Sequence, residues 1–299
     1  MAAFSTIASV SRPPFLLLVA SVMTLLAGLL LNTQITFDWS KFTLVCVSAL
    51  LAHIAVNAHN ELSDHRSGLD FHTDRTPFSG GSGALQADPI AESGVAYFVF
   101  ACLTITVVIG LYLVITSAFP LELAALGILG CAIIVSYTPL LNKFPILCLL
   151  SPGIGFGIIM LYGGSLVFIS EHSIIIFIAA LGMTALANNL LLLNQFPDRE
   201  ADKSHGRSHW VVRYSLSSAR WVYTLQYGLA VVCFASVIFR LHLSPFYYLS
   251  LFPLTFAAVV VKRLFEQRDF KIAESVLGAN VMSTVLTPLS MGIALCVAA

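Results

Sequence analysis

Long apolar runs alternate with shorter polar segments along the whole chain. A helix needs about 20 mostly apolar residues to cross the hydrocarbon core of a bilayer. Runs close to that length lie at residues 13–32, 42–60, 94–116, 121–141, 146–169, 173–195, 219–239, 245–261 and 277–297. The pattern therefore predicts an all-α, polytopic membrane protein with nine transmembrane helices.

The composition agrees with a protein that lies in a lipid bilayer. Of the 299 residues, 58% are hydrophobic and 10% are charged, whereas about a quarter of the residues in soluble domains are charged. We expect residues 1–299 to form a single integral-membrane domain, and we expect the first apolar run to be retained because it is longer than a signal-peptide core. The six cysteines lie in or beside apolar runs without a Cys-x-x-Cys spacing, which predicts packing residues.

Basic residues are distributed unevenly between the predicted loops. If the N-terminus is cytoplasmic, Lys41 and Arg240 fall outside and the other 13 of the 15 Lys and Arg residues fall inside. This bias predicts a cell inner or plasma membrane protein with its long polar loops, and an active site, facing the cytoplasm. The net charge is zero, which argues against a nucleic-acid partner.

The longest inner segments, 61–92 and 196–218, hold nine of the fifteen acidic residues. They follow the second and sixth predicted helices, which indicates a weak internal duplication. Positions i, i+3, i+4 and i+7 share one face of a helix. At the inner end of the second helix this face carries Asn57, Asn60, Glu61 and Asp64.

Two further features complete the acidic pattern. We expect Gly68 to end the second helix and let Asp70 fold back toward it. In the second segment Asp198 and Asp202 are four residues apart and share a face, and an asparagine, Asn194, precedes them. Pro197 is predicted to kink the sixth helix and turn both carboxylates inward.

Facing carboxylates repel each other unless a cation lies between them, and burial makes each unpaired charge costly. Mg²⁺ prefers few carboxylates together with water and phosphate oxygens, so the two clusters predict a Mg²⁺–diphosphate site. The alternative interpretation is a solvated face that pairs with nearby cations. Those cations are Arg75, Lys143, Arg199 and Lys203.

The spacing of these residues resembles the UbiA superfamily of intramembrane prenyltransferases. The matching patterns are Asn60-Glu61-x-x-Asp64-x-x-x-Gly68-x-Asp70, Asp74-Arg-Thr-Pro-Phe-Ser-Gly-Gly and Asp198-x-x-x-Asp202-x-x-x-Gly206. Arg12-Pro13 and Tyr137-Thr-Pro-Leu-Leu-Asn-Lys143 also resemble segments of that family. The resemblance covers nearly the whole chain and implies helices arranged around a central cavity.

The resemblance also implies roles for individual residues. Mg²⁺ would be held by Glu61, Asp64, Asp70, Asp198 and Asp202. The catalytic set would be Asp64, Asp198 and Tyr137, with Tyr137 shaping the acceptor pocket. Substrate contacts would come from Asn57, Asn60, Arg75, Lys143, Asn194 and Lys203.

The segments are more similar to the dihydroxynaphthoate branch of the family than to its hydroxybenzoate branch. Two positions depart from the family pattern. Glu61 stands where Asp is usual, and Arg207-Ser208-His209 stands where Lys-Arg-Thr is usual. The longer Glu61 side chain puts the geometry of metal coordination in doubt, and the second departure puts the branch in doubt.

The implied reaction is Mg²⁺-dependent transfer of a polyprenyl group from a polyprenyl diphosphate to an aromatic acceptor, in the biosynthesis of quinones such as menaquinone. Apolar helix walls rich in Phe and Leu would hold the prenyl tail, with the opening toward the lipid bilayer. Intramembrane acids and weak repeats also mark ion-coupled secondary transporters, but those acids lie near mid-bilayer, whereas these lie at helix ends. A CDP-alcohol phosphotransferase is also Mg²⁺-dependent, yet its Asp-Gly-x-x-Ala-Arg pattern is absent from the sequence.

Several weaker signals allow two interpretations. His53 and His59 lie on or beside the polar stripe, and a hydrogen-bonded packing role is favoured over proton transfer from the acceptor. The Gly153-x-x-x-Gly157 spacing predicts close helix packing. The glycines at 80, 81 and 83 are compatible with a phosphate cradle or with a lid. The remaining inner histidines are predicted to lie on the surface, and they are His65, His72, His205 and His209.

Overall fold

The computed structural model describes residues 2–33, 35–73 and 75–299, so Asp74 of the sequence pattern lies outside the described residues. All regular elements in these ranges are helical, which confirms the all-α prediction. Seven helices there are long and apolar enough to cross a membrane. They are α2 (Pro13–Leu31), α3 (Trp39–Ser67), α5 (Glu92–Ile115), α7 with its continuation η4 (Pro145–Gly163), α8 (Ile174–Ser204), α10 (Leu216–Arg240) and α12 (Glu274–Ala298).

The two remaining predicted runs are less regular. Residues Pro245–Leu251 (η5) and Leu254–Glu266 (α11) form a pair bent by 50°, which makes an eighth span if the pair crosses as one. Helix α6 (Pro120–Ser136) is apolar but has only 17 residues. All nine predicted runs are therefore helical, while the described residues contain seven or eight full-length spans.

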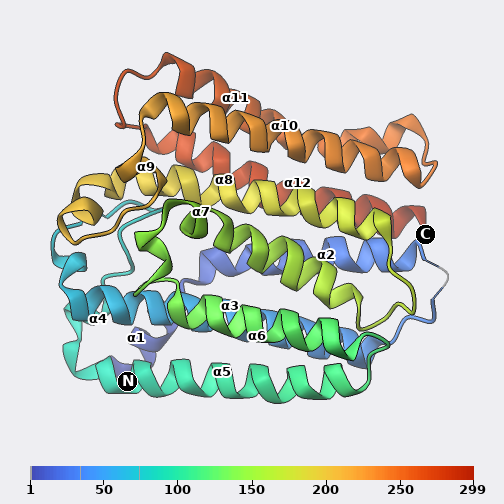
Figure 1. Cartoon of the computed structure of the whole chain (residues 1–299), viewed down its shortest axis with the longest axis horizontal. Coiled ribbons are helices and arrows are strands. Elements are labelled where there is room, and N and C mark those ends of the chain that lie inside the picture. The colour runs from blue at the N-terminus through green and yellow to red at the C-terminus, as the bar shows by residue number, and fades with distance from the viewer. Residues whose placement is uncertain (1, 34, 74) are drawn as a thin grey trace.

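Short elements gather mostly at one end of the bundle (Figure 1). Helix α1 (Ala2–Val10) precedes α2, and the segment between α3 and α5 contains η1 (Leu69–Phe71), α4 (Ala84–Ala87) and η2 (Pro89–Ala91). Two more short elements are η3 (Leu141–Lys143), before α7, and α9 (Trp210–Arg213), after α8. These elements connect the long helices where the acidic segments are found.

Helices α3 and α8 extend beyond their apolar runs. Asp38 caps the start of α3, and Gly68, with φ 78°, ends it in the left-handed conformation that glycine tolerates. Ser173 caps the start of α8, which remains helical through Pro197 as far as Ser204. The acidic residues therefore lie on continuous helical extensions, and the helix does not end at the proline.

The long helices pack side by side in a closed bundle (Figure 1). Successive helices contact one another, and α12 returns to pack against α2. A Cβ atom at Gly28 of α2 would lie 2.5 Å from the Gly292 carbonyl oxygen of α12. Glycine at both positions lets these two backbones come into direct contact.

A second close approach involves α7, η4 and α8. Pro152 lies inside α7 and lacks an amide hydrogen, and the following residues Ile154–Gly163 form a π-helix. A Cβ at Gly153 would lie 2.6 Å from the Thr184 carbonyl oxygen, and one at Gly157 would lie 2.4 Å from the Ala180 carbonyl oxygen. The predicted close packing at these glycines is confirmed.

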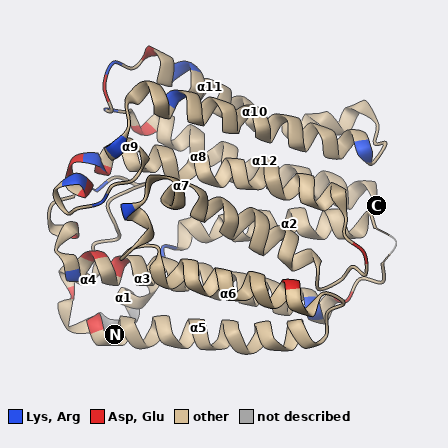
Figure 2. Cartoon of the chain, in the orientation of Figure 1, with Lys and Arg blue, Asp and Glu red and all other residues tan. Residues whose placement is uncertain are grey.

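Charged residues gather at the two ends of the bundle, and the middle parts of the helices contain few of them (Figure 2). Lys41 lies at the start of α3 and Arg240 at the end of α10. Asp64 and Asp202 lie at the opposite ends of α3 and α8. The bundle thus has an apolar middle and one end that is rich in both acids and bases.

Candidate active site

A cavity of about 690 Å³ lies among α3, α5, α6, α7, η4 and α8. Its polar end includes Asp64 and Asp198, and its walls continue along apolar residues to Leu113 and Val167. Val107 of α5 and Ile128 of α6 line the cavity and are also exposed on the outside of the bundle. The cavity therefore joins a charged mouth to an apolar chamber that reaches the surface between α5 and α6.

The first polar wall comes from α3 and the segment that follows it. Asn57, Asn60, Asp64 and Asp70 all line the cavity. Asn60 donates to Asp64 Oδ2 over 3.1 Å and accepts a hydrogen bond from Thr138 over 2.9 Å. Asn57 donates to the Ser11 carbonyl oxygen over 3.1 Å. These bonds hold Asn57, Asn60 and Asp64 on the single helix face that the sequence predicts.

The second polar wall comes from α8. Asn194, Asp198 and Asp202 line the same cavity as the α3 residues, so the structure brings the two distant acidic segments together. Within the described chain, Asn194 Oδ1 and Asp198 Oδ1 are buried without a hydrogen-bond partner. Buried oxygens without partners point to a missing ligand, water or ion.

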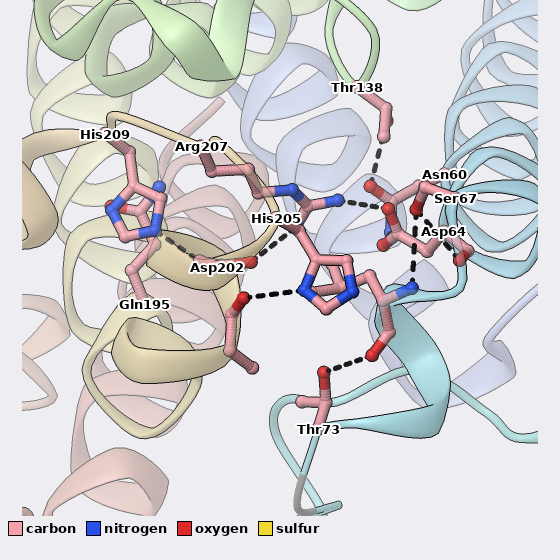
Figure 3. Close-up of polar contacts among 12 residues, drawn as sticks. Asn60, Asp64, Ser67, Thr73, Thr138, Gln195, Asp202, His205, Arg207 and His209 are labelled. Atoms are coloured by element: carbon pink, nitrogen blue, oxygen red, sulfur yellow. Dashed lines mark hydrogen bonds and ion pairs between the residues drawn. The ribbon is translucent and has the colours of Figure 1, made fainter.

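One guanidinium group joins the two walls. Arg207 forms an ion pair with Asp64 of α3 and donates to Asp202 Oδ1 of α8 over 2.9 Å (Figure 3). Burial lowers the pKa of Arg207, but the two carboxylates outweigh burial and hold the pKa above its ordinary value. Arg207 is therefore a fixed cation between the acidic segments.

Asp202 has a second partner, His209, whose Nε2 atom lies 2.7 Å from Asp202 Oδ2. The prediction that His209 lies on the surface is wrong, because only 1% of this residue is exposed. Gly206, with φ 78°, turns the chain after α8, and the Arg207 amide donates to the Asp202 carbonyl oxygen over 3.0 Å. The turn places both Arg207 and His209 back against Asp202.

Glu61 lies in a separate ion pair beside the mouth. Its Oε1 atom accepts hydrogen bonds from Arg12 Nε and from the Ser82 amide, each over 2.7 Å. A Cβ at Gly81 would lie 3.4 Å from Glu61 Oε1 and 3.1 Å from Asp70 Oδ1. The glycine-rich segment thus covers Glu61 and Asp70, and Arg12 supplies a second, half-buried cation at the site.

Tyr137 follows α6 and lines the cavity near the second wall. Its hydroxyl group lies 3.7 Å from the Cys148 sulfur, and Gln195 donates to the same sulfur over 3.2 Å. Residues from three parts of the chain therefore meet at this point.

Three of the predicted phosphate-binding cations are not part of the cavity lining. Arg75, Lys143 and Lys203 are exposed, and the Arg75 guanidinium lies against Gly83. The lining cations are instead Arg12 and Arg207. In the sequence, Arg12 belongs to the Arg12-Pro13 pattern and Arg207 to the segment that departs from the family pattern, and neither is predicted there to line the site.

The carboxylates at the mouth differ in how much of their coordinating capacity is left for a divalent metal. No group of three or more His, Cys, Asp or Glu side chains is arranged as a metal site in the described ranges. Arg207 and Arg12 occupy three of the five predicted ligands, and the remaining two, Asp70 and Asp198, each keep one buried oxygen without a partner. Two carboxylates from opposite walls, each with one unpaired oxygen, fit a metal ion that arrives with phosphate oxygens of its own.

Asp70 lies in the short η1 element, outside the long helices. Burial raises the pKa of Asp70 above its ordinary value, and the nearby carboxylate of Glu61 adds to the rise. A cation at this position would lower that pKa and remove the cost of the buried charge.

The fold and the cavity define a membrane enzyme with a charged mouth above an apolar chamber. The model of the UbiA prenyltransferase family matches residues 21–293, and the chain belongs to this family. It is therefore a prenyltransferase. Comparison with curated protein sequences gave no match.

Solved structures show the same fold at low sequence identity. A UbiA homologue from Archaeoglobus fulgidus bound to DMAPP and Mg²⁺ has 15% identity and a TM-score of 0.69, with 98% of this chain and 99% of that chain covered. The apo UbiA homologue from Aeropyrum pernix K1 has 15% identity and a TM-score of 0.70, with 94% and 97% covered. Digeranylgeranylglyceryl phosphate synthase has 16% identity and a TM-score of 0.63, with 99% and 98% covered.

Proposed function

We propose that this protein transfers a polyprenyl group from a polyprenyl diphosphate to an aromatic acceptor similar to dihydroxynaphthoate, in quinone biosynthesis, with Mg²⁺ as the metal. The observation that carries the proposal is the convergence of two acidic segments on one mouth above an apolar chamber. Homologues with this fold were solved with DMAPP or GPP and Mg²⁺.

Asp70 and Asp198 are the residues we assign to the metal, because their free oxygens face the mouth from opposite walls. When bound, Mg²⁺ would supply positive charge that neutralises the departing diphosphate. Arg12 and Arg207 add fixed positive charge at the same mouth, and Asp64, Asp202 and Glu61 hold these two guanidinium groups in place. Such preorganised charges stabilise a leaving diphosphate without reorganisation.

The chamber below the mouth would hold the prenyl tail and keep water away from the reacting carbon. Its walls include Phe156, Met160 and Leu190, and it reaches the lipid-facing surface between α5 and α6. The tail can therefore stay in contact with the bilayer while the diphosphate lies at the mouth. Exclusion of water prevents hydrolysis of an electron-poor allylic intermediate.

We further propose that the chain works as one membrane domain with its mouth toward the cytoplasm. The support is the predicted charge bias, since only Lys41 and Arg240 belong to the opposite side. Asn57, Asn60 and Asn194 would hydrogen-bond the head of the substrate from the lining. Lys143, Arg75 and Lys203 would act from the exposed rim.

A direct assay tests this function. Purified protein in lipid nanodiscs would be incubated with farnesyl diphosphate, Mg²⁺ and a panel of aromatic acceptors, and products would be identified by mass. We expect a prenylated aromatic product that depends on Mg²⁺ and disappears with EDTA. Prenyl transfer only to a glycerol phosphate lipid, or no transfer at all, would overturn the aromatic acceptor.

An ion-coupled transporter is disfavoured by the position of the acids. They lie at helix ends beside the polar loops, whereas the middle of the cavity is apolar. Proteoliposome uptake driven by a proton or sodium gradient, without prenyl transfer, would favour the transporter.

A further inference from the structure

His53 lies on α3 below the acidic residues, and it faces the cavity. Residues 53, 57, 60 and 64 share one face of the helix, because they are separated by four, three and four positions. All four line the cavity. At about 1.5 Å per residue, His53 lies roughly 6 Å deeper than Asn57 and roughly 12 Å deeper than Glu61.

One nitrogen of the His53 imidazole has no hydrogen-bond partner among the described residues. His53 is only 8% exposed, and its Nε2 atom is buried without a hydrogen-bond partner among the described residues. Its ring packs against Phe156, with 5.1 Å between ring centroids. The contact with Phe156 agrees with the expected packing role, whereas Nε2 lacks the expected hydrogen bond and remains unpaired.

Of the three substrate groups, only the aromatic acceptor can hydrogen-bond Nε2 of His53. The diphosphate belongs at the mouth with Asp70 and Asp198, two helical turns or more above His53. The prenyl tail is a hydrocarbon and offers no hydrogen bond. The aromatic acceptor, which must lie next to the first carbon of the tail, is the remaining source of polar atoms at this depth.

A hydroxyl group suits this position better than other acceptor groups. A hydroxyl can donate to a bare imidazole nitrogen and can accept from a protonated one, so it pairs with either neutral tautomer of histidine. A carboxylate would bring a net charge into a wall formed by Ala49, Ala52 and Phe156, where burial of charge is costly.

We propose that His53 hydrogen-bonds a ring hydroxyl of the aromatic acceptor and selects acceptors that carry it. This assignment rests on the proposed function. The equivalent position on α8, four residues before Asn194, is Leu190, which also lines the cavity. The acceptor hydroxyl is therefore directed toward α3, and the apolar edge of the ring toward α8.

The test compares acceptors rather than overall activity. His53→Leu, His53→Gln and the wild-type protein would be assayed with dihydroxynaphthoate and with analogues that each lack one hydroxyl. Ile54→Ala serves as the matched control, because it changes packing beside His53 on α3 and Ile54 does not line the cavity. Binding of farnesyl thiodiphosphate with Mg²⁺ would be measured separately on every variant.

We expect His53→Leu to lower kcat/KM for dihydroxynaphthoate by about ten- to hundredfold, the usual effect of leaving a buried hydrogen-bonding group unpaired. His53→Gln should recover a large part of this loss. For the analogue that lacks the relevant hydroxyl, wild type and His53→Leu should have similar kcat/KM values. Farnesyl thiodiphosphate binding should not change.

Other outcomes overturn the assignment in distinguishable ways. An equal loss for all acceptors, or a loss of farnesyl thiodiphosphate binding, would mean that His53 packs against the tail or supports the fold. Ile54→Ala reproducing the same acceptor discrimination would have the same meaning. A wild-type protein that binds farnesyl thiodiphosphate but prenylates no aromatic acceptor would overturn the proposed function itself, and this assignment with it.

Discussion

Helices α3 and α8 each carry acidic residues to the same mouth, but their carboxylates are neutralised differently. On α3, Glu61 pairs with Arg12 and Asp64 pairs with Arg207. On α8, Asp202 pairs with Arg207 and His209, whereas Asp198 keeps a buried oxygen without a partner. On the α3 side, the described carboxylate with an unpaired buried oxygen is that of Asp70, which lies in η1 after the end of α3.

The carboxylates therefore have two different tasks, and the sequence pattern alone does not distinguish them. Paired carboxylates orient the two half-buried guanidinium groups, and carboxylates with an unpaired oxygen remain for a metal. A buried charge is tolerated when it is paired, and removal of one partner leaves the other at high cost. The walls can therefore be distinguished by substitutions that remove a free acid, a bridging base or a covering glycine.

The largest effect is expected at the free acid of α8. Asp198→Asn keeps the shape of the side chain but removes the charge that faces the mouth, so Mg²⁺-dependent transfer should fall by on the order of a hundredfold or more. Product formation would be followed by mass spectrometry, with thermal unfolding as a check on folding. Glu200→Gln, an exposed position on the same helix, is the control. Comparable activity of Asp198→Asn and the control would contradict the metal assignment.

Arg207 should matter for stability as well as for activity, because it bridges both walls. Arg207→Ala leaves Asp64 and Asp202 facing each other without their cation, and loss of one partner of a buried pair costs about 3–5 kcal/mol. We expect a clear decrease in Tm, measured by differential scanning fluorimetry in detergent. Arg263→Ala removes an exposed pair with Glu266 and should change stability by less than about 1 kcal/mol. Equal Tm values would show that Arg207 does not bridge the walls in solution.

Gly81 tests the cover over the α3 side. Its φ is 74°, and a Cβ would approach Asp70 Oδ1 to 3.1 Å, so Gly81→Ala combines backbone strain of about 1–2 kcal/mol with pressure on a free carboxylate. We expect a several-fold rise in the Mg²⁺ concentration needed for half-maximal activity. Gly68→Ala has a similar φ of 78° and no atom within 4 Å of the new Cβ, so it isolates the strain. If Gly81→Ala and Gly68→Ala need the same Mg²⁺ concentration, the contact of residue 81 with Asp70 does not affect metal binding.

The smallest effect is expected outside both helices. Lys143 is exposed and does not line the cavity, so Lys143→Ala should lower kcat/KM for the prenyl diphosphate by less than about threefold and leave acceptor KM unchanged. Steady-state kinetics with each substrate varied in turn would measure both values. A much larger loss confined to the prenyl diphosphate would show that the η3 segment moves to the diphosphate during turnover.

The helical fold was predictable because the apolar runs have membrane length and few interruptions. The ends of α3 and α8 were not, since polar residues such as Asp64 and Asp202 continue the helices beyond the apolar runs. The bend between η5 and α11 was also not visible in the hydropathy pattern, because both parts are apolar. Periodicity thus locates helices better than it locates their limits.

The candidate site was partly predictable for a similar reason. The spacing of Asn57, Asn60 and Asp64 fixes their common face on any helix, and the structure places them on one wall. Arg207 and His209 reach Asp202 through a turn at Gly206, and no period in the sequence encodes such a turn. A positively charged residue directly after a glycine that ends an acidic helix was the one signal available.

The contact between Gly28 and Gly292 also bears on how the protein is made. Helix α2 leaves the ribosome long before α12, yet the two pack backbone to backbone. During synthesis α2 must wait in the membrane with its glycine face covered by lipid or by an insertion factor. Closure of the bundle by the contact between α2 and α12 is therefore a late step of biogenesis. A polypeptide that stalls before α12 would contain every residue of the mouth but would lack the helix that closes the bundle.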